Sequence, residues 1–303
     1  MFKSYLTSTL RDIFNNKGYS AINIFGLALA LAASWLISLF VEDELGYDNF
    51  IPDGDNTYRM EVIAKSATRT DERYPYFMGA YAPLLKEQSS DILDSTRYQT
   101  TQLAVAVGDR FFYEDITFTD ANFIEFMGIE APSNILTDQL SIIITETVAN
   151  KYFPNENAVG QIMTIAGQVD YRVAQVMPDF PRKSHMAISM IAPYNRDFMD
   201  IDQEFMSMNN MTYIRLRDGV DPNTVTPLLY KLIDENVAPY NNLPASQARE
   251  PIYIGVKDVY LKSPAGVVGK AGGDFNVVIG FISVAILLIV IATVNYINLA
   301  TAR

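Results

Sequence analysis

The chain has 303 residues, of which 49% are hydrophobic and 19% are charged, and it carries a formal net charge of −12 and no cysteine. This length suffices for two average soluble domains. The negative charge disfavours nucleic-acid binding, because phosphate affinity depends on lysine and arginine, and the absence of cysteine excludes disulfides, thiolate metal sites and a cysteine nucleophile.

The first predicted element covers residues 1–20. Apolar side chains recur there at helical spacing beside Lys3, Arg11 and Lys17. An apolar stripe next to basic groups is typical of helices that lie on a membrane surface. We therefore predict a cytoplasmic amphipathic helix over residues 1–20.

Two uncharged segments, Ala21–Val41 and Val277–Leu299, lie near opposite ends of the chain. As helices they would be about 32 and 35 Å long, enough to cross a hydrocarbon core of about 30 Å. The first could instead be a cleaved signal peptide. Its apolar run continues past the alanines at 28–33, however, which favours an uncleaved anchor. We predict transmembrane helices over residues 21–41 and 277–299.

The orientation of these helices is predicted from the basic residues beside them. Three basic residues precede the first helix, and Arg303 follows the second. Positive charge favours the cytoplasmic side, so both termini, including residues 300–303, are expected in the cytoplasm of a cell with this protein in its inner (plasma) membrane. Residues 42–276 would then be periplasmic. Subtracting +2 for residues 1–20 and +1 for Arg303 from the chain's −12 leaves this segment with −15.

Strand-like and helix-like segments alternate between the two spans, which predicts an α+β domain. In chain order the predicted strands are Thr57–Ala64, Tyr98–Val107, Arg110–Phe118, Ser141–Ile144, Gln161–Ile165, Tyr171–Met177, Met211–Leu216 and Ile252–Val256. The predicted helices are Phe77–Gln88, Thr119–Met127, Thr145–Phe153 and about 222–236. Gly108-Asp109 indicates a hairpin turn between the second and third strands.

Known catalytic motifs are missing from the sequence. It contains no GxxxxGK[ST] phosphate loop, GxSxG, HExxH or EF-hand spacing. The only histidine, His185, follows Ser184, and a hydrogen-bonding role for it is favoured over a catalytic triad because no acid partner is evident. The acidic residues from Glu42 to Asp55 do not have the spacing of a calcium-binding loop. This favours a group of solvent-exposed carboxylates beside the membrane over a cation site.

Polar residues in the second predicted span indicate a contact with another helix. Asn295 and Asn298 lie three positions apart, with Thr293 nearby. Polar side chains in lipid favour positions that face a partner helix. Together with Gly26 of the first span, these asparagines are the predicted helix-packing positions.

Several segments of the chain resemble motifs of one family, the FtsX/MacB-type ABC-transporter permeases. The segments occur in the same order and at the same spacing as the motifs of that family. The segments are Leu10–Lys17, Ser20–Ala28, Glu44–Phe50, Asp55–Met60, Ile142–Gly160, Tyr171–His185 and Ile291–Arg303. Within them, the motif positions of the periplasmic core are Glu44, Tyr47, Asp48, Tyr58, Arg59, Lys151, Tyr152, Phe153, Gly160, Ser184 and His185. The chain departs from the family pattern at Ala30, where a glycine is usual, at Tyr260, where a histidine is common, and in the short loop Gly128–Gln139.

This resemblance implies a porter-like subdomain over 44–118 and 185–276, with a Sabre-like insert at 119–184. It also implies a permease component that is not an enzyme and binds no cofactor itself, because ATP is used by a partner ATPase. The implied partners are a cytoplasmic ABC ATPase subunit, a second permease copy or half, and a periplasmic adaptor or client protein. Such proteins transmit the work of ATP hydrolysis to the outer domain, a process called mechanotransmission, in export or in lipoprotein and peptide handling.

Two other functions are compatible with two spans around an external domain. One is a membrane sensor, and the other is a membrane-anchored activator of a cell-wall enzyme. The family has at least four spans, so the resemblance implies that this chain is a fragment or a half permease. A sensor would continue beyond Arg303 into a soluble signalling module, whereas a permease would continue into further spans.

Overall fold

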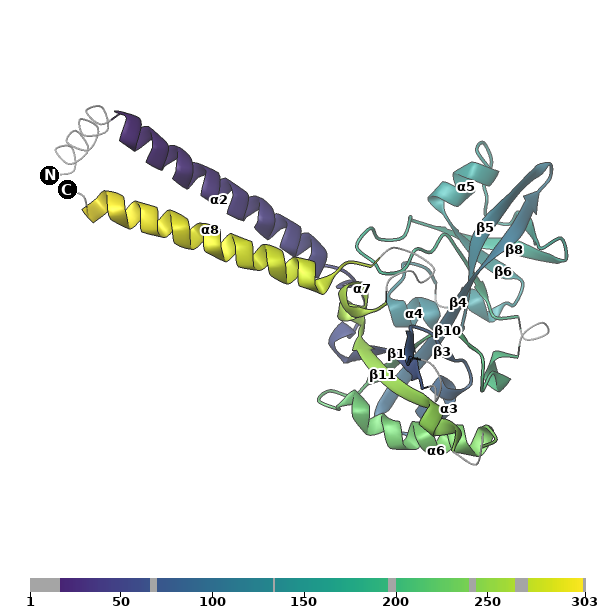
Figure 1. Ribbon diagram of the computed structural model, residues 1–303. Helices are drawn as coiled ribbons and strands as arrows, with labels where there is room; N and C mark the ends of the chain where they lie inside the picture. Colours follow the sequence, from purple (N-terminus) through teal and green to yellow (C-terminus); the bar gives the residue numbers. More distant parts are fainter. Residues whose placement is uncertain are drawn as a thin grey trace. The chain divides into compact units, whose positions relative to one another are not determined.

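The computed structural model describes residues 17–65, 70–132, 134–195, 200–239, 244–264 and 272–301 (Figure 1). The chain divides into two compact units, Met1–Gly46 with Asp274–Arg303, and Tyr47–Gly273. Most of the amphipathic helix predicted over 1–20, and the last two residues, lie outside the described residues.

The first unit contains the antiparallel helices α2 (Lys17–Leu45) and α8 (Phe275–Thr301), which lie side by side (Figure 1). Both are long and apolar enough to cross a membrane. The less exposed side chains of α2 recur mainly every three or four residues, at Ser20, Asn23, Leu27, Ala30, Ala33, Ser34, Ile37, Val41 and Glu44. This spacing is typical of a packed helix pair, and small or polar residues let two helices approach closely.

In the second unit, the described residues form an 11-stranded sheet in which the main path runs β11-β1-β10-β4-β5-β9-β6-β8-β7. These strands are β1 (Thr57–Ala64), β4 (Ile92–Val107), β5 (Arg110–Thr119), β6 (Ser141–Thr145), β7 (Ile162–Ile165), β8 (Val169–Met177), β9 (Met190–Pro193), β10 (Met208–Leu216) and β11 (Arg249–Gly255). The short strands β2 (Glu72–Tyr74) and β3 (Phe77–Met78) pair with β1 and β10.

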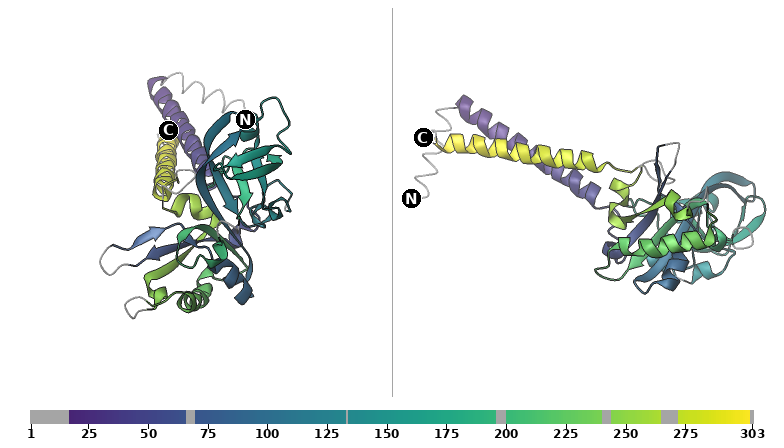
Figure 2. Two further views of the ribbon diagram at one scale, coloured as in Figure 1. Left: turned by 90° about the vertical axis from the view of Figure 1, so that its right-hand side faces the viewer. Right: turned by 60° about the horizontal axis from the view of Figure 1, so that its bottom comes forward.

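The second half of this path closes into a six-stranded barrel, because β4 also pairs with β7. Its strands curve around one another in the left view of Figure 2. The interior is apolar and includes Val105, Ile142, Met163 and Val173. Helix α5 (Glu146–Tyr152) follows β6, and the Thr145 side chain accepts a hydrogen bond from the Val148 amide at its start.

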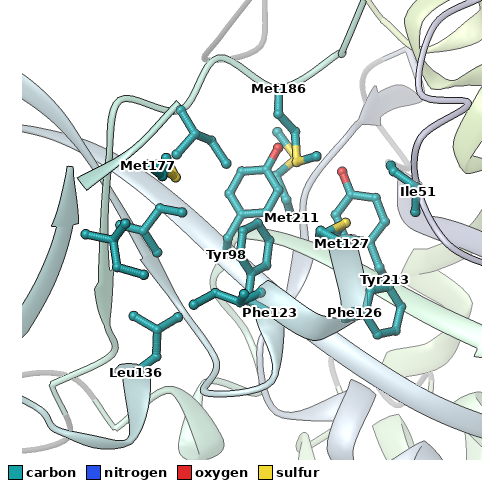
Figure 3. Packing of buried hydrophobic residues seen from close by; sticks show 14 of the residues in the cluster. Ile51, Tyr98, Phe123, Phe126, Met127, Leu136, Met177, Met186, Met211 and Tyr213 are labelled. Atoms are coloured by element: carbon teal, nitrogen blue, oxygen red, sulfur yellow. The ribbon is translucent and has the colours of Figure 1, made fainter. Parts of the chain in front are cut away.

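The first half of the path, β11-β1-β10-β4, is an open antiparallel sheet with apolar side chains on both faces. Helices α3 (Tyr81–Gln88) and α6 (Thr226–Asn236) pack on one face, where Met60, Ile214 and Leu229 are fully buried. Helix α4 (Phe123–Met127) packs on the other, against Tyr98 and Tyr213 (Figure 3). Strand β4 belongs to both the sheet and the barrel, so the two share a continuous strand.

The remaining helical segments are short. They are α7 (Val259–Lys262) and the 3₁₀ turns Gly54–Asn56, Ile135–Thr137, Ile201–Gln203, Pro222–Val225, Ala245–Ala248 and Val256–Asp258.

The predicted α+β class is confirmed, and so is the hairpin at Gly108-Asp109 between β4 and β5. The helix predicted over Phe77–Gln88 is wrong at its start, because Phe77 and Met78 pair with β10 as a strand and the helix begins at Tyr81. The strand predicted to begin at Tyr98 begins instead at Ile92. The subdomain boundaries predicted at 118–119 and 184–185 stay predictions.

Candidate functional site

Asp48 lies at the centre of a buried polar cluster that joins segments far apart in the sequence. Its side chain is fully buried, and its backbone has a positive φ of 59°. Oδ1 accepts hydrogen bonds from the Ser184 hydroxyl (3.1 Å) and from the His185 amide (3.0 Å). The Asp48 amide in turn donates to the Lys183 carbonyl (3.0 Å). The start of the domain is therefore fastened to the segment that follows β8.

His185 extends this cluster into the core. Its Nδ1 lies 2.9 Å from Oδ2 of Asp48, although this contact lacks the alignment of a hydrogen bond. Its Nε2 lies 2.7 Å from the hydroxyl of Tyr213, and the Tyr213 ring stacks on that of Tyr98. Figure 3 shows both tyrosine rings among the methionines of the cluster. Buried polar groups such as these need partners, because burying one without a hydrogen bond costs about 1 to 3 kcal/mol.

Arg59 lies on the same face of the sheet as Tyr213, which it pairs with across β1 and β10. Its guanidinium bonds Glu61 and the Ser263 hydroxyl, and Glu61 also bonds Arg73 (2.7 Å). Arg59 and Glu61 are both buried. Two buried polar groups thus link β1 to β2 and to the residue that follows α7.

The tyrosines of this cluster predict a loss of stability at alkaline pH. Burial raises the pKa of Tyr98 to about 12 and raises that of Tyr213 well above its usual value. The folded state keeps these phenols neutral, whereas in the unfolded chain they ionise near pH 10. The contribution of these neutral phenols to the free energy of unfolding is therefore fully present below pH 10, and it is lost as the pH rises towards about 12. Unfolding curves collected by circular dichroism at pH 9 to 12 should show this decline, and Tyr98→Phe should make it shallower; an unchanged pH slope in Tyr98→Phe would contradict the assignment.

Ser184, His185 and Asp48 do not form a catalytic triad. The Ser184 hydroxyl bonds Asp48 and the Met186 amide, and the far nitrogen of His185 faces Tyr213. In a triad the histidine would instead accept the serine proton. Ser184 is also fully buried. Within the described ranges, no three His, Cys, Asp or Glu side chains lie close enough to hold a metal ion.

The second group of motif residues lies at the barrel and is separate from Asp48. Lys151 pairs with Glu114 (2.5 Å) and lies over the Phe112 ring, and the Tyr152 hydroxyl bonds the same carboxylate (2.9 Å). Phe153 is buried in the barrel core. Gly160 has a φ of 90°, which favours glycine, and its amide donates to the Val173 carbonyl. These residues fix α5 and its following loop to the barrel.

The other predicted positions lie elsewhere. Tyr47 stacks on Tyr260, and Tyr58 is partly buried and packs against the core that contains Met60 and Leu229. Glu44 lies in the last turn of α2. In the helix pair, a side chain at Gly26 would lie 3.9 Å from the amide nitrogen of Asn295, so these two predicted packing positions come together. The side chain of Asn298 lies outside what the structure describes.

Sequence reasoning missed Tyr98, Tyr213 and Glu61, because each lies inside a strand pattern that predicts only core packing. The sequence signal that could have identified them is the presence of polar residues at strand positions that otherwise predict a buried face. Arg59 and Glu61 alternate with Met60 and Val62, so one face of β1 had to bury charge. Which segment would satisfy that charge depends on tertiary pairing.

One known protein family, described as the MacB-like periplasmic core domain, matches residues 20–229 of this chain. No curated protein sequence matches the chain.

Similar solved structures include three domains of transport-related proteins. A domain of a putative permease protein from Porphyromonas gingivalis has a TM-score of 0.55 and 16% identity, covering 67% of this chain and 90% of that one. The periplasmic region of MacB from Actinobacillus actinomycetemcomitans has a TM-score of 0.46 and 14% identity, covering 69% and 92%. The extracellular domain of the noncanonic ABC-type transporter YknZ from Gram-positive bacteria has a TM-score of 0.46 and 12% identity, covering 65% and 100%. At these identities the first likeness shows a shared fold.

The family match covers more than half of the chain and includes Asp48, Ser184, His185 and Tyr213. The resemblance found in the motifs is thereby confirmed. The chain belongs to the family of proteins that carry a MacB-like periplasmic core domain.

Proposed function

We propose that the chain is a permease component of an ABC transporter of the MacB/FtsX type. The observation that carries this proposal is a MacB-like core domain enclosed in the sequence by two long apolar helices that pack as an antiparallel pair. A domain joined to membrane helices at both of its ends can receive force through two connections.

In this proposal a separate cytoplasmic ATPase hydrolyses ATP, and the helices pass the resulting movement to the periplasmic domain. The domain suits this role because its sheet and barrel share β4, and because buried charges fasten its segments together. Closely packed interiors transmit displacement instead of absorbing it. The work would serve export or the handling of lipoproteins or peptides, with a second permease copy and a periplasmic adaptor or client as further partners.

The orientation can be tested with thiol labelling, because the chain contains no cysteine. Lys231→Cys lies on an exposed part of α6, and Gly18→Cys lies at the start of α2, where no side chain would meet a neighbour. A membrane-impermeant maleimide applied to cells with a permeabilised outer membrane should label Lys231→Cys. It should label Gly18→Cys only after lysis. Equal labelling of both before lysis would contradict the orientation with cytoplasmic termini.

Coupling to ATP can be tested by hydrogen exchange. The chain would be reconstituted in nanodiscs with the second permease half that the resemblance implies and with an ABC ATPase of this transporter type, and it would be compared with the same complex containing a hydrolysis-deficient ATPase. We expect ATP turnover to change exchange in β1, β10 and β11 by about threefold or more, because sheet amides open with the element that moves. Identical exchange in both complexes, with ATP hydrolysis proceeding in the first, would contradict the proposal and favour a sensor or an anchored activator.

A further inference from the structure

Tyr260 contacts both ends of the periplasmic domain. The domain begins at Tyr47 and ends at Gly273, after which the chain continues into α8. The rings of Tyr47 and Tyr260 stack with centroids 3.5 Å apart and planes 4° from parallel. The amide of Gly273 donates a hydrogen bond to the Tyr260 carbonyl, at 2.9 Å. One residue of α7 therefore holds the first residue of the domain by its ring and the last by its backbone.

Gly272 is required for this approach. A Cβ atom at this position would lie 2.9 Å from the Tyr260 carbonyl oxygen, closer than real Cβ contacts allow. The obstacle is a backbone atom and not the end of a flexible side chain, so it cannot turn aside. The glycine lets the chain pass close enough for the next amide to reach the same carbonyl.

Tyr260 is itself fixed to the core. Its neighbours Val259 and Leu261 are buried, as is Val256 of the preceding turn. Ser263, which follows α7, bonds the buried carboxylate of Glu61 (2.5 Å) and the guanidinium of Arg59. Displacement of α7 would therefore disturb the buried charges of β1.

The Tyr47 side of the contact is fixed as firmly. Its neighbour Asp48 is fully buried and bonded to Ser184 and His185. Face-to-face stacking is not the arrangement that two aromatic rings prefer by themselves, because their faces carry like partial charge. Anchors on both sides explain why these two rings nevertheless lie parallel and close.

We propose that Tyr47, Tyr260, Gly272 and Gly273 form a clasp that ties together the two chain segments leading to α2 and α8. The clasp is the point at which movement of either helix reaches α7 and, through Ser263, strand β1. Its role in transmission rests on the proposed function, whereas its existence as a coupled unit does not.

Hydrogen exchange at Gly273 tests whether the clasp is one unit. The full chain in nanodiscs, without ATPase, would be compared with Tyr47→Ala, Tyr47→Phe and Gly272→Ala. Because Tyr47 touches Tyr260 by its ring, loss of that ring should speed exchange of the Gly273 amide about tenfold, and Tyr47→Phe should retain protection. Gly272→Ala should act from the other end and speed exchange of the Asp48 amide, which bonds the Lys183 carbonyl.

Two matched variants control for substitution alone. A Cβ at Gly280 of α8 meets nothing within 4 Å, and Tyr113 is 65% exposed on β5. Gly280→Ala and Tyr113→Ala should leave the Gly273 amide as protected as in the parent chain. Amides of β6 and β8 report whether each variant remains folded. If Tyr47→Ala speeds exchange of the β6 and β8 amides, that variant is not folded, and the Asp48 exchange rate in Gly272→Ala then tests the clasp. Gly273 exchange that stays at the parent rate in a folded Tyr47→Ala, or unchanged Asp48 exchange in Gly272→Ala, would refute the clasp.

A second arm tests transmission in the complex that hydrolyses ATP. Tyr47→Ala should keep the ATPase rate while the ATP-dependent exchange change in β1 falls by about threefold or more. If the parent chain shows no ATP-dependent change, the proposed function fails and the exchange result at Gly273 still stands. If the parent chain responds and Tyr47→Ala responds equally, the clasp does not transmit.

Discussion

Asp48→Ala is expected to destabilise the MacB-like core domain by about 3 kcal/mol, because removing the shared acceptor of a buried polar cluster leaves two buried donors without a hydrogen bond. The variant would leave the Ser184 hydroxyl and the His185 amide without their acceptor and would remove the carboxylate beside the His185 ring. For a domain of this size, the melting temperature should fall by about 6 to 12 °C. Thermal unfolding of the full chain in detergent, followed by near-ultraviolet circular dichroism, measures this change.

Asp53→Ala is the matched control for Asp48→Ala. Asp53 also has a positive φ, of 50°, but it is exposed and its side chain caps nothing. Both variants place alanine in a left-handed conformation, which costs about 1 kcal/mol. The difference between them therefore reports the buried cluster. Melting temperatures within about 2 °C of each other would show that the Asp48 cluster contributes little.

The second large effect is expected at Arg97 of β4. Its buried guanidinium bonds Asp120 with two nitrogens (2.9 and 2.7 Å), Asp202 (2.9 Å) and the Gly79 carbonyl (2.8 Å). Burial is the largest single effect on the pKa of the Arg97 guanidinium, and it lowers this pKa. The hydrogen bonds to Asp120 and Asp202 and the charges of these carboxylates together raise it by more, so the pKa is raised overall. Arg97→Ala should cost about 3 kcal/mol, because two neighbouring carboxylates lose their shared cation. Urea unfolding of the full chain would show a lower midpoint.

Two further variants, Arg172→Ala and Arg97→Lys, serve as controls for the loss of stability expected in Arg97→Ala. The Arg172 side chain is 58% exposed and its guanidinium pairs with Asp138 at 3.1 Å, so its loss should cost about 1 kcal/mol or less. Arg97→Lys keeps the charge but cannot form the two-nitrogen contact with Asp120, so an intermediate loss is expected. If Arg97→Ala unfolds at the same urea concentration as Arg172→Ala, the Arg97 cluster does not hold β4 to its neighbours.

The sequence predicted the local elements well where a pattern is short-range. The apolar runs, the alternation in Thr57–Ala64 and the turn at Gly108 each specify their own structure. It could not predict the closure of the barrel, since this depends on two residues of β7 pairing with β4 about 60 positions earlier. Nor could it predict that Phe77 and Met78 form a strand, because β10 supplies their partner from a distant segment.

The candidate site was predicted in part. Asp48, Ser184 and His185 were singled out through their motifs, and the structure brings all three together. Their connection to Tyr213 was hidden, because a tyrosine in a strand of apolar residues indicates only core packing. Lys151 and Tyr152 were selected by the same resemblance but lie at the barrel, beside Glu114. Motif membership therefore identified important positions without showing which of them act together.

The central proposal is that the ATP cycle of a partner ATPase changes the geometry between the apolar helices and the MacB-like core domain, so that movement passes from one to the other; it is tested most directly by a distance between two spin labels. The cysteine-free chain permits labels at Lys231→Cys, which is exposed on α6, and at Val277→Cys, which is exposed in the first turn of α8. In complex with the second permease half and an active ATPase, the distance distribution should shift between the nucleotide-free and ATP-bound states, and it should not shift with an ATPase that cannot bind ATP. The same distribution in every nucleotide state, in a complex that hydrolyses ATP, would contradict the account.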